Sequence, residues 1–112
     1  MAAHEGYLAG VEQWRLLQVA WAEADGEASR LEEMQKTVLA ELTNQFRDGG
    51  ESVAGAESKA RASKHYIDHI RRMVEARTKA NIARAAADAK KMAYEAWRTD
   101  SATKRAEAQL VR

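Results

Sequence analysis

The residues best suited to metal chemistry are two histidines in the segment KHYIDHIRR, residues 64–72. His65 and His69 are four residues apart, so on a helix both rings lie on one face, as the rings of metal-binding pairs do. Asp68 is adjacent but points only partly the same way. Zinc usually takes three or four protein ligands, and this pair also lacks the glutamate of an HExxH helix. We therefore interpret both histidines as polar residues beside an apolar stripe, and we expect neither a metal nor a cofactor.

The other common catalytic patterns are missing from the sequence. The chain has no cysteine, which excludes thiol catalysis and thiolate zinc sites. Gly49 and Gly50 are not followed by the lysine and the serine or threonine of a phosphate-binding loop. Paired carboxylates do not recur in the Glu-x-x-His pattern of di-iron bundles. We expect that the protein is not an enzyme.

Basic side chains are concentrated in the second part of the chain. Residues 1–47 carry 4 basic and 8 acidic side chains, whereas residues 48–112 carry 14 basic and 9 acidic ones. Phosphate contacts need lysine or arginine on one exposed surface, and Arg77, Arg84 and Lys91 form a heptad-spaced row. These three residues and Arg71 are the candidates for nucleic-acid binding. The structural alternative is that the acidic and basic halves pair with each other in an antiparallel hairpin.

Five aromatic residues are candidates for a protein interface. Tryptophan and tyrosine are enriched among the residues that dominate binding energy at protein interfaces. Trp14 and Trp21 are one heptad apart, which indicates a buried or interfacial stripe rather than exposed platforms for stacking bases. The full set of interface candidates is Tyr7, Trp14, Trp21, Tyr94 and Trp97.

Long helices must position these residues. The chain contains no proline, the residue that breaks helix interiors, and residues 5–47 keep a helical period without interruption. Apolar residues recur there in an a/d pattern for about six heptads, and strand-like alternation is absent. We therefore predict a helix over 5–47. Its stripe is Tyr7, Gly10, Trp14, Leu17, Trp21, Ala24, Ala28, Leu31, Gln35, Val38, Leu42 and Gln45.

The run RDGGES interrupts this pattern and predicts a turn over 48–51, because two adjacent glycines tolerate the positive φ of a helix C-cap. Ser52 or Ser58 would cap a second helix, predicted over 52–98. Near Thr99–Ser101, either a break starts a short third helix over 101–111 or the long helix runs straight through. The expected stripe of the second helix is Ile67, Ile70, Val74, Thr78, Ile82, Ala85, Ala89, Met92 and Ala96.

The predicted fold is all-α: a long, antiparallel, coiled-coil-like two-helix hairpin that forms a single domain over residues 1–112. In the register set by a turn near residue 50, Tyr7 and Trp14 fall opposite roughly Ala86 to Ala93, so the aromatic residues cluster away from the turn. A two-helix hairpin lacks a three-dimensional core. We therefore expect a homodimer that completes a helical bundle.

Residues 93–112, AYEAWRTDSATKRAEAQLVR, carry a resemblance to a known group of proteins. An alanine-rich helix with Tyr and Trp is followed by a short polar break and an Ala/Thr/Lys/Arg/Glu-rich segment. This pattern resembles segments of small helical accessory proteins encoded by bacteriophages and other mobile elements. The resemblance implies a role beside phage nucleic-acid metabolism or against a host defence system, and it transfers no catalytic residues.

The functional prediction is a helical interaction protein that binds another protein. A nucleic-acid-binding accessory protein is the alternative. No apolar run approaches the roughly 20 residues of a membrane helix, and the N-terminus lacks the pattern of a signal peptide. We therefore expect no membrane partner and a cytoplasmic location.

Overall fold

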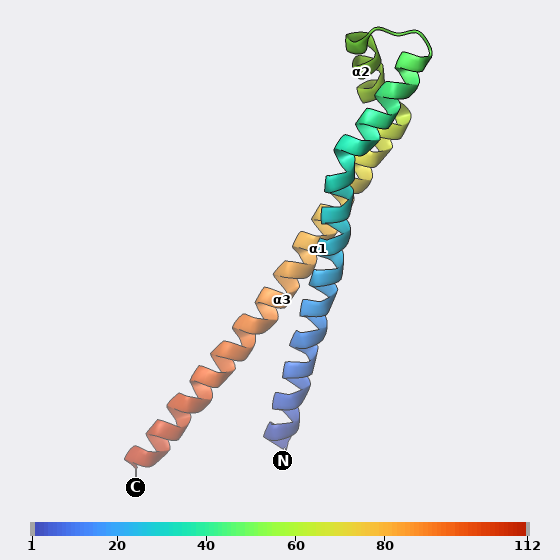
Figure 1. Ribbon diagram of the computed structural model, residues 1–112. Coiled ribbons are helices and arrows are strands. Elements are labelled where there is room, and N and C mark those ends of the chain that lie inside the picture. Colours follow the sequence, from blue (N-terminus) through green and yellow to red (C-terminus); the bar gives the residue numbers. More distant parts are fainter. Residues whose placement is uncertain (1, 112) are drawn as a thin grey trace. The chain divides into compact units, whose positions relative to one another are not determined.

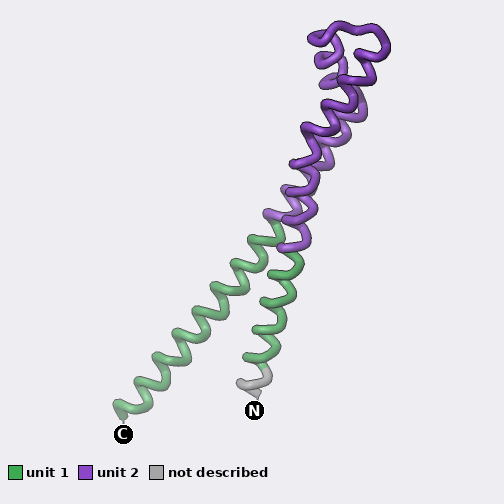
Figure 2. Tube along the Cα trace, viewed as in Figure 1, with its two compact units in different colours: residues 1–21, 82–112 green, residues 22–81 purple. Residues whose placement is uncertain are grey.

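The computed structural model describes residues 2–111, which form three helices: α1 (Ala2–Asp48), α2 (Val53–Ala62) and α3 (Lys64–Leu110) (Figure 1). No strand occurs within these residues, and the predicted all-α class is confirmed. Their contacts divide the chain into two compact units (Figure 2). Unit 1 contains the residues up to Trp21 and those from Ile82 onward, and unit 2 contains Ala22–Asn81. No helix of the described residues combines the length and the apolar character needed to cross a membrane.

The first helix ends as the glycine pair predicts. Gly49 N–H donates to the Gln45 carbonyl at 3.2 Å, and Gly50 follows with a φ of 101°, a conformation that favours glycine. Ser52 then caps α2, because its hydroxyl accepts a hydrogen bond from Gly55 N–H at 3.2 Å. Both the turn and this cap were predicted from the sequence.

The prediction of one uninterrupted second helix over 52–98 was wrong at Ser63. This residue has extended backbone (ψ 150°) and ends α2. Its hydroxyl donates to the Ala60 carbonyl at 2.6 Å and accepts from Tyr66 N–H at 3.3 Å, so one side chain serves both helix ends. The break separates α2 from α3, so the two helices are not one continuous helix.

The short third helix over 101–111 does not form as a separate element. α3 continues through Thr99–Ser101 to Leu110. That segment contains neither glycine nor proline, so nothing in its backbone stops a helix once several turns have formed. The Lys104 ammonium also lies 3.1 Å from the Asp100 carboxylate, an i,i+4 pair across the expected break.

In unit 2, three helices surround a small core, which a two-helix hairpin does not provide. Leu42 of α1, Ala60 of α2 and Tyr66 of α3 are buried together. Ala56, also on α2, is fully buried. The small side chains let α2 lie close to its neighbours. Partly buried side chains that pack against this core are Val38, Leu39, Phe46 and Ile70.

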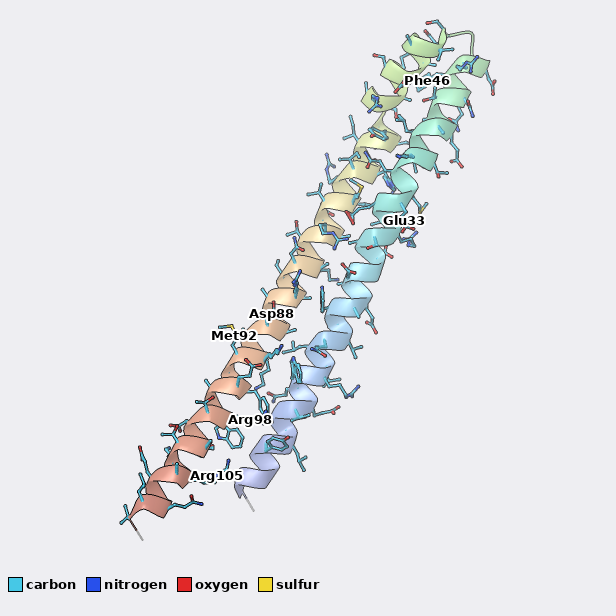
Figure 3. All side chains as sticks on the ribbon, turned by 60° about the vertical axis from the view of Figure 1, so that its left-hand side comes forward. Glu33, Phe46, Asp88, Met92, Arg98 and Arg105 are labelled. Atoms are coloured by element: carbon cyan, nitrogen blue, oxygen red, sulfur yellow. The ribbon has the colours of Figure 1, made fainter. Side chains whose placement is uncertain are left out.

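The predicted stripe of α3 was wrong in phase. Ile82 and Met92 are 66% and 69% exposed, and Figure 3 shows Met92 on the side of α3 away from α1. A second row contains the less exposed residues; it is displaced by one residue from the predicted stripe as far as Met73 and by two residues after that. In unit 2 this inner row is Tyr66, His69, Met73, Ala76 and Ala80, and in unit 1 it is Ala83, Ala87, Lys90 and Tyr94.

The tryptophans of α1 account for this choice in unit 1. Trp14 and Trp21 are large, and the inner row offers Ala83 and Ala87 along the stretch of α3 beside them. Small residues on one helix leave room for bulky ones on the other, which satisfies close packing. The more hydrophobic row of α3 therefore remains exposed.

Candidate functional site

Tyr7, Tyr94 and Trp97 form an aromatic cluster in unit 1. The Tyr7 ring centroid lies 5.6 Å from that of Tyr94 and 6.0 Å from that of Trp97, and the Tyr94 and Trp97 rings are 6.2 Å apart. These are ordinary separations for interacting aromatic pairs. The cluster was predicted at this end of the chain. Tyr7 lies opposite Tyr94 and Trp97, close to the predicted register, in which Tyr7 and Trp14 fall opposite roughly Ala86 to Ala93.

The cluster borders a cavity of about 320 Å³. Gly6 and Gly10 line its α1 side, and a Cβ added at either glycine would meet no neighbouring atom within 4 Å. The missing side chains therefore leave open space beside Tyr7. Tyr7 and Trp97 remain 38% and 46% exposed, so the aromatic walls are accessible from solvent. The remaining lining residues, all from α3, are Lys90, Ala93, Tyr94 and Trp97.

One charged side chain, Lys90, lines this cavity. Hydrogen bonding with the Tyr7 side chain raises the pKa of Tyr94 above its ordinary value, while the Arg98 charge nearby opposes the shift. The Tyr94 phenol therefore stays neutral at neutral pH, and Lys90 contributes an ammonium group to the lining. Arg98 lies on the same stretch of α3 (Figure 3). The site combines an apolar aromatic wall with cationic groups.

Trp14 and Trp21 do not belong to this cavity. The Trp14 indole N–H is shielded from solvent and has no hydrogen-bond partner among the described residues. Trp21 lies beneath Arg84, whose Cζ is 5.5 Å from the ring centroid, a cation–π contact. Both side chains are half-buried between α1 and α3. They act in the structure as packing residues of unit 1.

Arg77, the first residue of the predicted basic row, is held within unit 2. Its Nη1 donates to Asp25 Oδ1 at 2.6 Å, and its Nε donates to Glu32 Oε1 at 3.2 Å. Ser29 Oγ accepts a further bond from Nη2 at 3.4 Å. The two carboxylates raise the pKa of Arg77 above its already high value. The acidic α1 and the basic α3 are thus paired internally at this point. This contact supports intramolecular pairing as the explanation of the charge asymmetry.

Replacing Arg77 by glutamine is expected to lower the thermal midpoint of unfolding by about 2–5 °C, because Asp25 and Glu32 would lose the cation that they share. The shift should diminish at 1 M salt, where such charges are screened. Circular dichroism melts of Lys79→Gln give the control, since Lys79 is exposed on the same helix. Equal midpoints for the two variants would contradict the role of this ion-pair cluster.

The other basic candidates differ in their surroundings. Arg71 is exposed, with Nη1 3.9 Å from Asp68 Oδ1, and Arg84 lies beside Trp21 and 3.9 Å from Asp88 Oδ2. Lys91 is exposed. The heptad-spaced row is therefore not a uniform set of solvent-facing cations. Nucleic-acid binding through this row stays a prediction, with Arg77 the member most firmly engaged elsewhere.

The two histidines have separate environments. His69 is 2% exposed, and its Nε2 lies 2.8 Å from the Leu31 carbonyl oxygen. Because a carbonyl only accepts, Nε2 carries the proton and donates. His65 is exposed one turn away. Within the described residues, no three histidine or carboxylate side chains form a group that could hold a metal ion.

Four residues of the cavity were missed in the sequence: Gly6, Gly10, Lys90 and Ala93. Gly6 and Gly10 are one helical turn apart and flank Tyr7, a spacing that signals an opening beside an aromatic side chain. Lys90 belongs to the inner row of α3, three residues after Ala87 and four before Tyr94. Its proximity to the rings follows from the phase of that row, which the sequence left undecided.

Comparison of the chain with protein-family models, with curated proteins and with solved structures found no significant match in any of the three.

Proposed function

We propose that this chain is a non-enzymatic helical interaction protein that binds another protein through the aromatic cavity of unit 1. The observation that carries the proposal is the open cavity beside Tyr7, Tyr94 and Trp97. Concave sites lined by aromatic side chains with a few polar groups are the usual form of binding pockets. A volume of about 320 Å³ accommodates one large side chain of a partner.

The exposure of the rings supports the same proposal. A chain that used these aromatic residues only for its own packing would bury them more completely, since burial of each ring stabilises the fold. Tyr7 and Trp97 instead keep a large part of their surface accessible. Aromatic residues in this state provide contact area at little cost in conformational entropy when a partner covers them.

Trp97→Ala is expected to weaken capture of the partner by at least about 30-fold, the loss typical of an interface hot spot. Helicity should be unchanged, because Trp97 is 46% exposed. The measurement compares the wild-type chain and the variant, each immobilised, in recovering binding proteins from cell extract, with circular dichroism on the same samples.

Leu8→Ala provides the matched control. Leu8 follows Tyr7 directly, is 52% exposed and does not line the cavity. Its truncation should leave capture within about twofold of wild type, as for most residues outside a hot spot. The same protein recovered equally by the wild-type chain, Trp97→Ala and Tyr7→Ala would refute the cavity as its binding site.

We further propose that the chain forms a homodimer through the exposed row of α3 in unit 1. This outer stripe repeats at a and d positions, and its alanines allow a neighbouring helix to approach closely. Ile82, Met92 and Leu110 supply its larger side chains and are all exposed. The stripe consists of Ile82, Ala85, Ala89, Met92, Ala96, Thr99, Thr103, Ala106 and Leu110.

The accessible surface supports self-association. The chain exposes 8509 Å². A compact monomer of 12.5 kDa would expose about 6,200 Å², roughly 2,300 Å² less. A standard interface takes about 800 Å² from each partner, so the excess is ample for a dimer and for a second contact at the cavity. No large side chain among the described residues is fully buried, which leaves burial for association to supply.

The resemblance of residues 93–112 to helical accessory proteins of phages and mobile elements indicates the biological system in which the partner acts. In that setting, the bound protein belongs to a host or phage nucleic-acid-processing system, which the chain inhibits or assists.

A further inference from the structure

The cations around the aromatic cavity restrict what the cavity can bind. Lys90 is half-buried in the cavity lining and forms no ion pair among the described residues. Arg98 adds a second positive charge close to Tyr94. The Tyr94 phenol, whose pKa is raised, does not offset these charges at neutral pH. An unpaired ammonium group beside an apolar wall favours an anion in the same ligand.

A cationic ligand fits this site poorly. Aromatic cages bind ammonium groups through the negative faces of their rings. Here Lys90 lines the same cavity as the three rings, so its ammonium group would repel a second cation bound there. A purely apolar ligand would cover the rings but leave the Lys90 charge partly desolvated and unpaired.

We propose that the cavity receives an aromatic or large aliphatic side chain of a partner segment, with Asp or Glu carboxylates flanking that side chain and pairing with Lys90 and Arg98. This inference rests on the proposed function and specifies the chemistry of the partner. The apolar side chain occupies the space that Gly6 and Gly10 leave open. The carboxylates provide the complementary charge.

A single-stranded nucleic acid would satisfy the same cations with phosphates and could stack one base on Trp97. The structure favours a peptide, because single-strand binding needs a groove of cations that follows the backbone. The described cationic row loses one of its three members, Arg77, to its carboxylate partners. An oligonucleotide is therefore included in the test as the competing ligand.

The test is a titration of the ¹⁵N-labelled 112-residue chain with three peptides, followed by NMR at the Trp97 indole N–H. These are acetyl-Glu-Glu-Phe-Glu-Glu-amide, its lysine counterpart acetyl-Lys-Lys-Phe-Lys-Lys-amide, and acetyl-Glu-Glu-Ala-Glu-Glu-amide, which lacks the apolar side chain. The acidic phenylalanine peptide should bind at least about fivefold more tightly than either of the other two, since only it satisfies both the rings and the cations.

Lys90→Gln should remove most of that preference for the acidic peptide, and Lys90→Arg should restore it. Lys91→Gln is the matched control, because it removes the same charge one residue away, where the side chain is exposed and outside the cavity lining. It should change the affinity by less than about twofold, since an exposed charge outside the cavity lining contributes little to an ion pair with the ligand.

The outcomes separate this inference from the proposed function. Equal or tighter binding of the lysine peptide would overturn the acidic-partner inference and leave the cavity as a protein-binding site. No shift of the Trp97 signal with either phenylalanine peptide would overturn both. If a ten-nucleotide oligothymidylate bound more tightly than the acidic peptide, and if Lys90→Gln abolished that binding, the ligand of the cavity would be a nucleic acid rather than a protein.

Discussion

Tyr66→Ala is expected to lower the free energy of unfolding by about 3–5 kcal/mol, the usual cost of truncating a buried aromatic side chain. Tyr66 is 8% exposed and forms the core of unit 2 together with Leu42 and Ala60. Its ring joins residues from all three helices, so a cavity there weakens each contact. Urea denaturation followed by circular dichroism, at one fixed protein concentration, measures the change.

Tyr66→Phe measures the contribution of the Tyr66 hydroxyl to stability separately from that of the ring. Gln35 Nε2 donates to the Tyr66 hydroxyl at 3.0 Å, a partly buried bond between α1 and α3. Phenylalanine keeps the packing and removes only this bond, so the expected loss is about 0.5–1.5 kcal/mol. If Tyr66→Ala cost no more than Tyr66→Phe, the three-helix core around Ala60 would not be a main source of stability.

The first helix and its end were predictable from the sequence because local signals specify them. The predicted span of 5–47 compares with Ala2–Asp48, and Asp48-Gly49-Gly50 ends the helix through the positive φ of Gly50. Ser63 carried an equally local signal, a serine before Tyr66, Ile67 and Ile70. Its role was missed because a serine tolerated within a helix has the same sequence context.

The phase of α3 depended on packing that no local signal specifies. The helix carries two heptad rows two residues apart, which lie about 200° apart around the helix axis. The row with Ile82 and Met92 is more hydrophobic and was chosen from the sequence. The row with Ala83 and Ala87 faces α1, because its small side chains complement Trp14 and Trp21. Size matching between helices, rather than hydrophobicity alone, decides such cases.

The candidate site was only partly predictable, because part of it also depends on packing between helices. The aromatic residues were expected away from the turn, and Tyr7, Tyr94 and Trp97 do meet there. The engagement of Arg77 could not be foreseen from its heptad spacing with Arg84 and Lys91. It depends on Asp25 and Glu32, which are about 50 residues away in the sequence and are brought close only by the antiparallel pairing.

The outer stripe of α3 is the proposed dimer interface. Its residues repeat as a coiled-coil seam does, yet α1 covers the inner row instead. In a two-fold symmetric pair, the outer stripe of one chain would meet the same stripe of the other, and each substitution would act twice. Ile82→Glu combined with Met92→Glu would then bury four carboxylates without cations, which should raise the dimer dissociation constant by at least about 100-fold.

Sedimentation equilibrium gives the decisive measurement. The wild-type chain should sediment at twice its mass of 12.5 kDa, and the double variant at the mass of one chain. Leu16→Glu is the control, because Leu16 is 53% exposed on α1 and lies outside the stripe, so this variant should remain dimeric. A monomeric wild-type chain would show that the outer stripe is open to a different partner. A dimer that survives in the double variant but not in Leu16→Glu would instead move the interface to α1, where Leu8, Leu16 and Val19 are exposed.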